Sequence, residues 1–164
     1  MNKKVFAVSV MTLLIDQVSK GLIDAYFAFE KQVPILKHFF NITNCHNEGA
    51  AWSIFTNQKV FILIFTFLAL LLIYRYLYVF KLNTRNNIAF GLLIGGIVGN
   101  LVDRVLFGYV RDFLDFYIIS YDYPVFNFAD VAIVVGVFLL FIAIFKGEDV
   151  KDATDRRRKR KAKN

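Results

Sequence analysis

The sequence predicts an all-α integral membrane protein in which four helices cross the bilayer. Hydrophobic residues make up 57% of the 164 residues, and the mean hydropathy is +0.51. The polar residues gather in blocks between long apolar runs. This pattern is typical of polytopic membrane proteins, and a chain of this length has room for a few spans with short loops. We therefore expect one domain.

Each predicted span is long enough for the bilayer core, which takes roughly 20 apolar helical residues. The spans cover about residues 5–28, 60–80, 88–107 and 129–145. The first begins MNKKVFAVSVMTLLI, which has the basic start and the apolar run of a secretory signal peptide. Asp16 and Lys20 interrupt that run and no small-residue cleavage site follows promptly, so we expect a retained helix.

The distribution of Lys and Arg predicts the orientation, because cytoplasmic loops carry an excess of both. Basic residues precede the first span, surround the connection KLNTRNN after the second, and fill the tail DRRRKRKAKN after the fourth. With an even number of spans these regions share one side, so both termini are predicted to be cytoplasmic. We expect residues 147–164 to be a disordered tail that contacts anionic phospholipid and binds no nucleic acid.

The other side of the membrane receives two segments, residues 29–59 and 108–128. We expect this extracytoplasmic loop region to be mostly non-helical, with room for a small β element. Cys45 is the single cysteine, which excludes an internal disulfide and a zinc-finger spacing. His38 and His46 have no third ligand at metal spacing, so we expect them to pack in the loop and to bind no metal.

Charged residues within the first span need partners. Asp16 and Lys20 are four residues apart, so they can pair on one helical face. An unpaired charge near the bilayer centre costs on the order of 2.5–3.5 kcal/mol, so we expect both to face protein or to reach toward the interface. The small residues Gly95, Gly96 and Gly99 of the third span allow another helix to pack closely there.

Two carboxylates are predicted to lie at matching depth near the outer interface. Asp112 follows the third span, and Asp130 opens the fourth from the same side. Two carboxylates that meet in a partly dry site cannot both ionise easily, so the pair holds a shared proton near neutral pH. Aspartic proteases use such a pair, in which one Asp activates a water and its partner protonates the carbonyl oxygen.

An alternative explains the same two residues without catalysis. Asp112 can pair with Arg111 or Arg104, and Asp130 can simply cap the N-terminus of the fourth span. The residues alone favour neither interpretation over the other.

Other catalytic sites find little support in the sequence. The HExxH, GxSxG and Walker motifs are absent. A Ser–Lys dyad of Ser19 or Ser53 with Lys20 is conceivable. Ser19 and Lys20 are sequence neighbours, however, and neighbours point about 100° apart on a helix, which argues against direct pairing.

Five motifs resemble, in their order along the chain, the bacterial lipoprotein signal peptidase (signal peptidase II) family. They are DQVSK, NEGAAWSIF, GNLVDR, VRDFLDF and FNFAD. The resemblance covers nearly the whole span region and leaves out only the basic tail. It implies a membrane aspartyl endopeptidase with four spans and both termini in the cytoplasm, so residues 1–146 form the four-span peptidase domain.

The resemblance also implies which residues form the site. The catalytic pair falls on Asp112 and Asp130. Substrate-binding or supporting positions fall on Asp16, Lys20, Asn47, Gly49, Trp52, Asn100, Asp103, Arg104 and Asn127. Arg111 departs from the family pattern, which usually has a small apolar residue directly before the aspartate. We expect the Arg111 side chain to point toward the membrane interface.

The function implied by the resemblance is removal of the signal peptide from diacylglyceryl-modified prolipoproteins, by cleavage just before the lipidated Cys. No metal and no cofactor is expected, and the chain is expected to act as a monomer in the bacterial cytoplasmic membrane, with its site near the extracytoplasmic face. A small ion or solute transporter that uses the intramembrane charges is the alternative from another class. Its weakness is that the polar residues crowd the outer half of the spans and do not line a full path.

Overall fold

The computed structural model describes residues 2–49, 59–81, 83–119 and 121–147. Within these ranges four helices are long and apolar enough to cross a membrane. The helices are α1 (Lys3–Tyr26), α2 (Lys59–Leu77), α3 (Thr84–Leu106) and α4 (Phe128–Phe145). The strands are β1 (Gln32–Leu36), β2 (Phe40–Asn47), β3 (Val110–Ile118) and β4 (Tyr121–Asp122). The prediction of four membrane helices is therefore confirmed.

The bounds of α3 differ most from the prediction, and its cap explains why. The hydrophobic run suggested a start near residue 88, yet the helix begins at Thr84. The Asn83 side chain accepts a hydrogen bond from the backbone N–H of Asn86 at 2.8 Å. Because this cap stabilises a polar first turn, hydropathy alone misses that turn.

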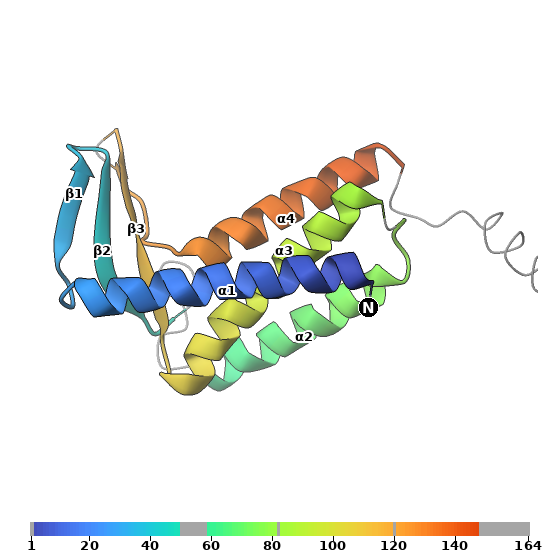
Figure 1. Ribbon diagram of the computed structural model, residues 1–164, viewed down its shortest axis with the longest axis horizontal. Helices are drawn as coiled ribbons and strands as arrows, with labels where there is room; N and C mark the ends of the chain where they lie inside the picture. The colour runs from blue at the N-terminus through green and yellow to red at the C-terminus, as the bar shows by residue number, and fades with distance from the viewer. Residues whose placement is uncertain (1, 50–58, 82, 120, 148–164) are drawn as a thin grey trace, which may run out of the picture.

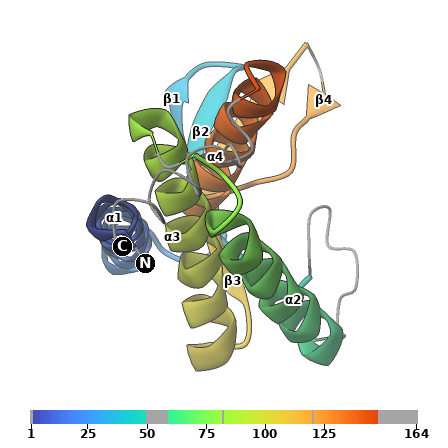
Figure 2. The same cartoon turned by 90° about the vertical axis from the view of Figure 1, so that its right-hand side faces the viewer.

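The central helix of the bundle is α3, which packs along α1 and α4 and over a smaller area against α2 (Figures 1 and 2). Glycines allow the close approach. A Cβ at Gly95 would lie 2.6 Å from the carbonyl oxygen of Ser9 on α1, and a Cβ at Gly96 would lie 2.6 Å from that of Ala129 on α4. The predicted role of these glycines in helix packing is thus confirmed.

The inner face of α1 is polar, whereas its outer face is apolar. Its buried side chains include Ser9, Thr12, Asp16 and Lys20. Large apolar side chains are exposed on the other face, among them Phe6, Met11, Leu14, Val18 and Leu22. This arrangement suits a helix surrounded by lipid, where polar groups must find their partners inside the protein.

The four strands form an antiparallel sheet in the order β1-β2-β3-β4 at one end of the bundle (Figure 1). The pairing of β2 with β3 runs from Phe40 opposite Phe116 to Asn47 opposite Val110, and its register shifts between Ile42 and Cys45. The expectation of a small β element is confirmed. One of its strands, β3, comes from the segment that links α3 to α4.

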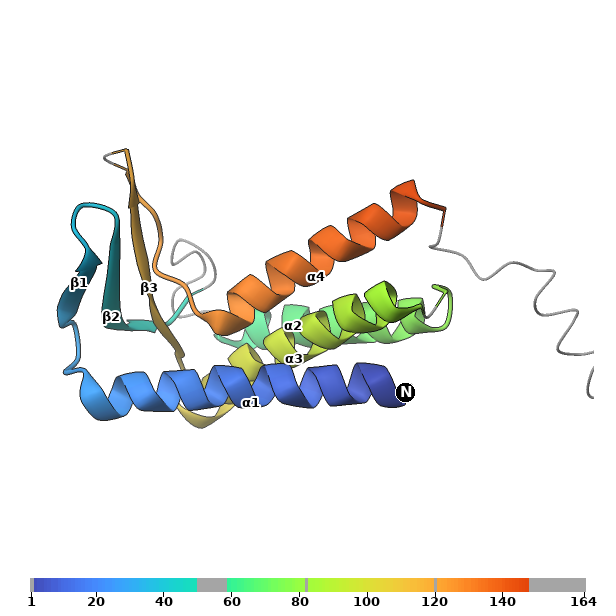
Figure 3. The same ribbon diagram turned by 45° about the horizontal axis from the view of Figure 1, so that its top comes forward.

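The two ends of the bundle differ in what they carry. The N-terminus of α1, the connection between α2 and α3, and the C-terminal end of α4 lie together at one end, and the sheet lies at the other (Figure 3). This grouping follows from four antiparallel crossings. It places the polar residues of the predicted site next to the sheet.

Candidate active site

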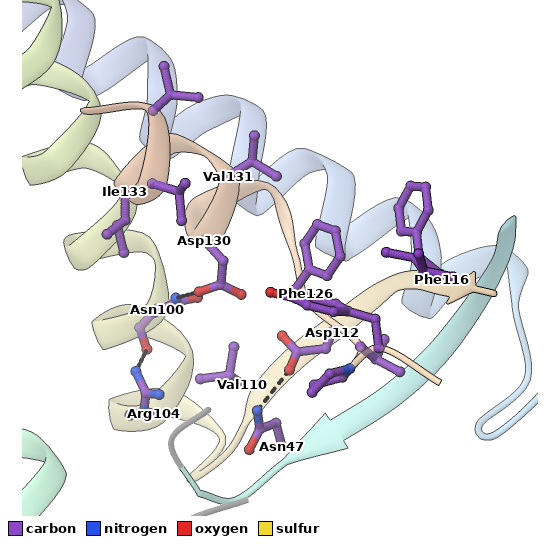
Figure 4. A pocket seen from close by; sticks show the side chains of 16 residues that line it. Asn47, Asn100, Arg104, Val110, Asp112, Phe116, Phe126, Asp130, Val131 and Ile133 are labelled. Carbon is purple, nitrogen blue, oxygen red and sulfur yellow. Dashed lines mark hydrogen bonds between the residues drawn. The ribbon is translucent and has the colours of Figure 1, made fainter. Parts of the chain in front are cut away.

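The two candidate catalytic carboxylates lie on different elements and point toward one another (Figure 4). Asp112 is on β3, and Asp130 is in the first turn of α4. The chain that leads into α4 is held against β3, because the carbonyl oxygen of Phe126 accepts hydrogen bonds from the backbone N–H groups of Phe113 (3.0 Å) and Leu114 (2.8 Å). These bonds fix the start of α4 beside Asp112.

Asn127 joins both carboxylates. Its side-chain Nδ2 donates to Asp112 Oδ1 at 2.6 Å, and its backbone N–H donates to Asp130 Oδ2 at 3.1 Å. In return, the backbone N–H of Asp130 donates to Asn127 Oδ1 at 3.1 Å, which completes a capping box. The helix-cap interpretation of Asp130 is therefore correct as far as it goes, but the same carboxylate also faces Asp112.

The remaining bonds to the pair also come from neutral donors. Asn47 Nδ2 donates to Asp112 Oδ2 at 2.9 Å, and Asn100 Nδ2 donates to Asp130 Oδ1 at 2.8 Å. The backbone N–H of Gly49 donates to Asn47 Oδ1 at 3.0 Å, which turns the Asn47 amide so that its nitrogen reaches Asp112. Neither carboxylate forms an ion pair within the described ranges, so the alternative in which Asp112 pairs with Arg111 or Arg104 is wrong.

Burial changes the acidity of Asp112, which is only 2% exposed. Desolvation first, and then the negative charge of Asp130, raise the pKa of Asp112 to about 7. Hydrogen bonds from Asn47 and Asn127 and the charge of Lys20 oppose this rise. A pair of this kind retains one proton near neutral pH, which acid–base catalysis by two carboxylates requires.

A buried polar cluster lies behind the pair and contains several residues that the motifs indicated. Lys20 Nζ lies 2.9 Å from Asp16 Oδ2, 2.9 Å from Asn100 Oδ1 and 3.3 Å from Asp103 Oδ2. Asp16 Oδ1 accepts a hydrogen bond from the backbone N–H of Ala129 at 3.0 Å. The cluster thus ties α1 and α3 to the N-terminus of α4.

Arg104 lies on the cavity side of the site. Its guanidinium donates long hydrogen bonds to the carbonyl oxygens of Asn100 (3.5 Å) and Gly49 (3.4 Å). It also lines the cavity described below. Trp52, which the resemblance places in the site, lies outside the described residues.

Arg111 corrects one expectation. Its side chain does not point to the membrane interface but is buried and pairs with Asp103 on α3. Asp103 is fully buried, and a buried carboxylate without a cationic partner is strongly destabilising. Pairing with Asp103 therefore stabilises the fold more than contact of Arg111 with the membrane interface would. Sequence reasoning missed two further partners of Arg111, Gln17 and Asp24 on α1. Their spacing of seven residues places them on one helical face, which is the signal that was available.

A cavity of about 630 Å³ opens beside the two aspartates (Figure 4). Its polar end contains Asn47, Asn100, Arg104, Asp112 and Asp130. Among the described residues, the remaining wall is apolar apart from one tyrosine and comes from β3, the approach to α4, and α4 itself: Val110, Phe116, Ile118, Tyr123, Pro124, Val125, Phe126, Val131, Ile133, Val134 and Val135. Such a cavity suits a ligand with a long apolar part and one polar point of reaction.

Ser19, Lys20 and His46, which were considered for other chemistry, have different contacts, and Ser53 lies outside the described residues. Ser19 Oγ donates to the carbonyl oxygen of Asp16 at 2.8 Å, and Lys20 is engaged by two carboxylates, so these two residues form no Ser–Lys dyad. The ring of His46 stacks on Tyr109 with centroids 3.8 Å apart and also contacts Phe29. This agrees with the expected packing role of His46.

Comparison with known proteins shows the family of the chain. The sequence model of the Signal peptidase (SPase) II family matches residues 8–146. Two proteins named Lipoprotein signal peptidase, from Staphylococcus aureus strains bovine RF122 / ET3-1 and JH9, are 38% and 37% identical over 152 residues. These cover 89% of this chain and 93% of each relative.

Two solved structures of a bacterial membrane enzyme, obtained by the in meso method at 2.3 and 1.9 Å resolution, are each 36% identical. Their TM-scores are 0.78 and 0.76. They cover 87% of this chain, and 87% and 92% of their own chains. These relatives lend no support to the transporter alternative. The chain belongs to the signal peptidase II family.

Proposed function

We propose that Asp112 and Asp130 are the catalytic dyad of this membrane lipoprotein signal peptidase, and that it cleaves diacylglyceryl-modified prolipoproteins just before the lipidated Cys. The observation that carries the proposal is the placement of the two carboxylates. Among the residues that the structure describes, they face one another, accept hydrogen bonds from neutral donors only, and lie at the polar end of a largely apolar cavity. The protease activity on prolipoproteins is that of the family.

The reaction follows from a pair that shares one proton. The ionised carboxylate takes a proton from a water molecule as the water oxygen attacks the scissile carbonyl carbon. The protonated carboxylate donates its proton to the carbonyl oxygen. When the tetrahedral intermediate collapses, the C–N bond breaks and the leaving amine takes up the proton that the first carboxylate received from water. At the same time one hydroxyl of the intermediate returns its proton to the second carboxylate as the new carbonyl forms, which restores the pair with one shared proton. Because the two groups titrate as a unit, we assign the starting base to the pair and not to one residue.

The cavity provides a place for each part of the substrate. The apolar wall formed by α4 and residues 123–126 can receive acyl chains, whose burial is favourable by about 0.8 kcal/mol per methylene. The amide of Asn47 and the guanidinium of Arg104 face the polar end, where they can bind carbonyl oxygens of the peptide. The scissile bond is thereby brought to the carboxylates.

The topology proposed for the protein rests on its basic residues. The end of the bundle that carries the N-terminus and the connection between α2 and α3 is the basic one, so we assign it to the cytoplasm. The sheet and the site then lie near the extracytoplasmic face of the bacterial cytoplasmic membrane. A signal helix with its N-terminus in the cytoplasm would deliver its cleavage site at that face.

The basic tail is proposed to act separately from catalysis. Residues 147–164 include DRRRKRKAKN, a charge run that can contact anionic phospholipid at the cytoplasmic surface. Residues 1–146 would then be the peptidase domain, acting as a monomer.

The test of the proposed function is cleavage of a defined substrate. The purified protein is incubated with a precursor that carries a diacylglyceryl-modified Cys, and the products are identified by mass. Cleavage directly before the modified Cys is expected, with no cleavage of the same precursor lacking the lipid. Cleavage at another bond, or of both precursors equally, would contradict the assigned specificity.

A further inference from the structure

We propose that Arg111, the residue directly before Asp112, is a positioning residue for the reaction. This inference rests on the proposed dyad. Side chains alternate across a strand, so Arg111 and Asp112 leave β3 on opposite faces. Asp112 reaches Asn47 and Asn127 beside the cavity, whereas Arg111 reaches into the helix bundle. Whatever holds the Arg111 side chain therefore also holds the backbone from which Asp112 extends.

The strongest contact of Arg111 is with Asp103 on α3. Its backbone N–H and its Nε donate to Asp103 Oδ2 at 3.0 and 3.2 Å, and its Nη2 donates to Oδ1 at 2.7 Å. Three donors of one residue thus bind both oxygens of one fully buried carboxylate. Bidentate pairing of this kind fixes direction as well as distance.

The same guanidinium also binds α1. Nη1 lies 3.1 Å from Asp24 Oδ2, and Nη2 donates to Gln17 Oε1 at 3.0 Å. The guanidinium carbon lies 4.6 Å from the centre of the Phe107 ring. One side chain therefore joins β3 to α1, to α3 and to the residue that ends α3. Its side chain is only 9% exposed, so solvent weakens these bonds little.

Arg111 also completes the charge balance behind the dyad. Asp16 and Asp103 are both fully buried, and Lys20 contacts both. One ammonium cannot neutralise two buried carboxylates, and Arg111 supplies the second positive charge. Lys20 is then able to donate to Asn100 Oδ1, while the amide nitrogen of Asn100 donates to Asp130. Through this chain of bonds, Arg111 acts on Asp130 as well as on Asp112.

Arg111 is absent from the residues that line the cavity, although Val110 and Asp112 on either side of it are among them. A change at Arg111 should therefore disturb the geometry of the carboxylates and leave substrate binding intact. In kinetic terms, kcat should fall while KM stays the same.

The experiment compares Arg111→Leu and Arg111→Lys with the full-length wild-type enzyme on the diacylglyceryl-modified precursor. The control Arg75→Leu removes the same charge from an exposed position on α2. We expect kcat of Arg111→Leu to fall about 10- to 100-fold with unchanged KM, since small displacements of catalytic groups have effects of that size. Arg111→Lys should recover part of the loss, because its ammonium keeps the positive charge but cannot bind all the hydrogen-bond acceptors that the planar guanidinium reaches. Arg75→Leu should behave as wild type.

An unchanged kcat in Arg111→Leu, with or without a rise in KM, would overturn the proposal. If Arg111→Leu does not fold in detergent, Arg111→Lys decides alone, and a folded lysine variant with wild-type kcat would contradict the positioning role. Asp112→Asn separates this inference from the proposed function. An active Asp112→Asn enzyme refutes the dyad, whereas an inactive one beside a fully active Arg111→Leu refutes only the role of Arg111.

Discussion

Asn127 holds Asp112 through its side chain, at 2.6 Å, and Asp130 through its backbone N–H, at 3.1 Å. One residue thus sets the spacing of both carboxylates and starts α4 at the same time. The hydrogen bonds of Asn127 that begin α4 therefore also hold the two carboxylates of the candidate site in place.

Removing the Asn127 side chain should separate these two roles. In Asn127→Ala, the lost cap should lower the free energy of unfolding by about 1 kcal/mol. The lost bond to Asp112 should in addition lower kcat. The matched control is Asn83→Ala, which removes the cap of α3 at the other end of the bundle. We expect both variants to lose melting temperature in detergent, Asn127→Ala more because its side chain also donates to Asp112 and Asn100, and we expect a loss of kcat only for Asn127→Ala. Equal kcat values in the two variants would contradict the bridging role.

The raised pKa of Asp112 predicts how activity depends on pH. The active pair carries one proton, and Asp112 has a pKa of about 7 because it is buried beside the charge of Asp130. As the pH rises through about 7 the pair loses that proton and both groups become ionised, so kcat should fall on the alkaline side. The measurement is a profile of kcat against pH with a precursor that has no titrating group near the cleavage site. A rate that climbs steadily from pH 6 to pH 9 would refute the shared proton.

Close packing of α3 against α4 gives a prediction about stability. A Cβ at Gly96 would lie 2.6 Å from the carbonyl oxygen of Ala129 and 2.9 Å from Cγ1 of Ile133. Gly96→Ala should therefore push α4 away and destabilise the protein by about 1–3 kcal/mol, as overpacking does. Gly21→Ala is the control, because a Cβ there meets nothing within 4 Å. Thermal unfolding in detergent should show a lower midpoint for Gly96→Ala and an equal or higher one for Gly21→Ala. Identical midpoints for the two variants would refute the helix contact.

The buried charges around Lys20 predict that a double variant is more stable than one of its single variants. Lys20→Met removes the partner of two fully buried carboxylates, and breaking a buried pair costs about 3–5 kcal/mol. The double variant Asp16→Asn/Lys20→Met leaves Asp103 paired with Arg111, so it should be more stable than Lys20→Met alone. Lys37→Met, at an exposed position, controls for the loss of a lysine. The measurement is again the unfolding midpoint in detergent. A double variant that is less stable than the single one would contradict this charge accounting.

Much of the fold could be predicted because helices that cross a lipid bilayer need long apolar runs, which are easy to see in a sequence. The runs that became α2 and α4 are almost wholly apolar, and a helix is the simplest structure that satisfies its own backbone in a membrane. The strand that carries Asp112 was harder to predict from the sequence. Its register comes from pairing with β2, whose paired residues lie 63 to 76 positions earlier in the chain, from Asn47 opposite Val110 to Phe40 opposite Phe116, and from a shift between Ile42 and Cys45 that no local pattern encodes.

The orientation of Arg111 shows a second limit and also a usable rule. A cation beside water at the interface was the reasonable expectation for one residue considered alone. The buried cluster as a whole, however, contains Asp16 and Asp103 with Lys20 as the other cation. Counting these charges together would have indicated that a second cation had to turn inward.

The most direct test of the central claim is the rate of cleavage of a diacylglyceryl-modified precursor by Asp112→Asn, Asp130→Asn and Asp122→Asn, each purified and checked for wild-type helicity. Asp122 is an exposed carboxylate on β4, in the same sheet as Asp112, so it controls for the substitution itself. We predict loss of measurable cleavage in the first two variants and a wild-type rate in the third. Turnover by either Asp112→Asn or Asp130→Asn at the wild-type rate would contradict the assignment of these two residues as the catalytic dyad.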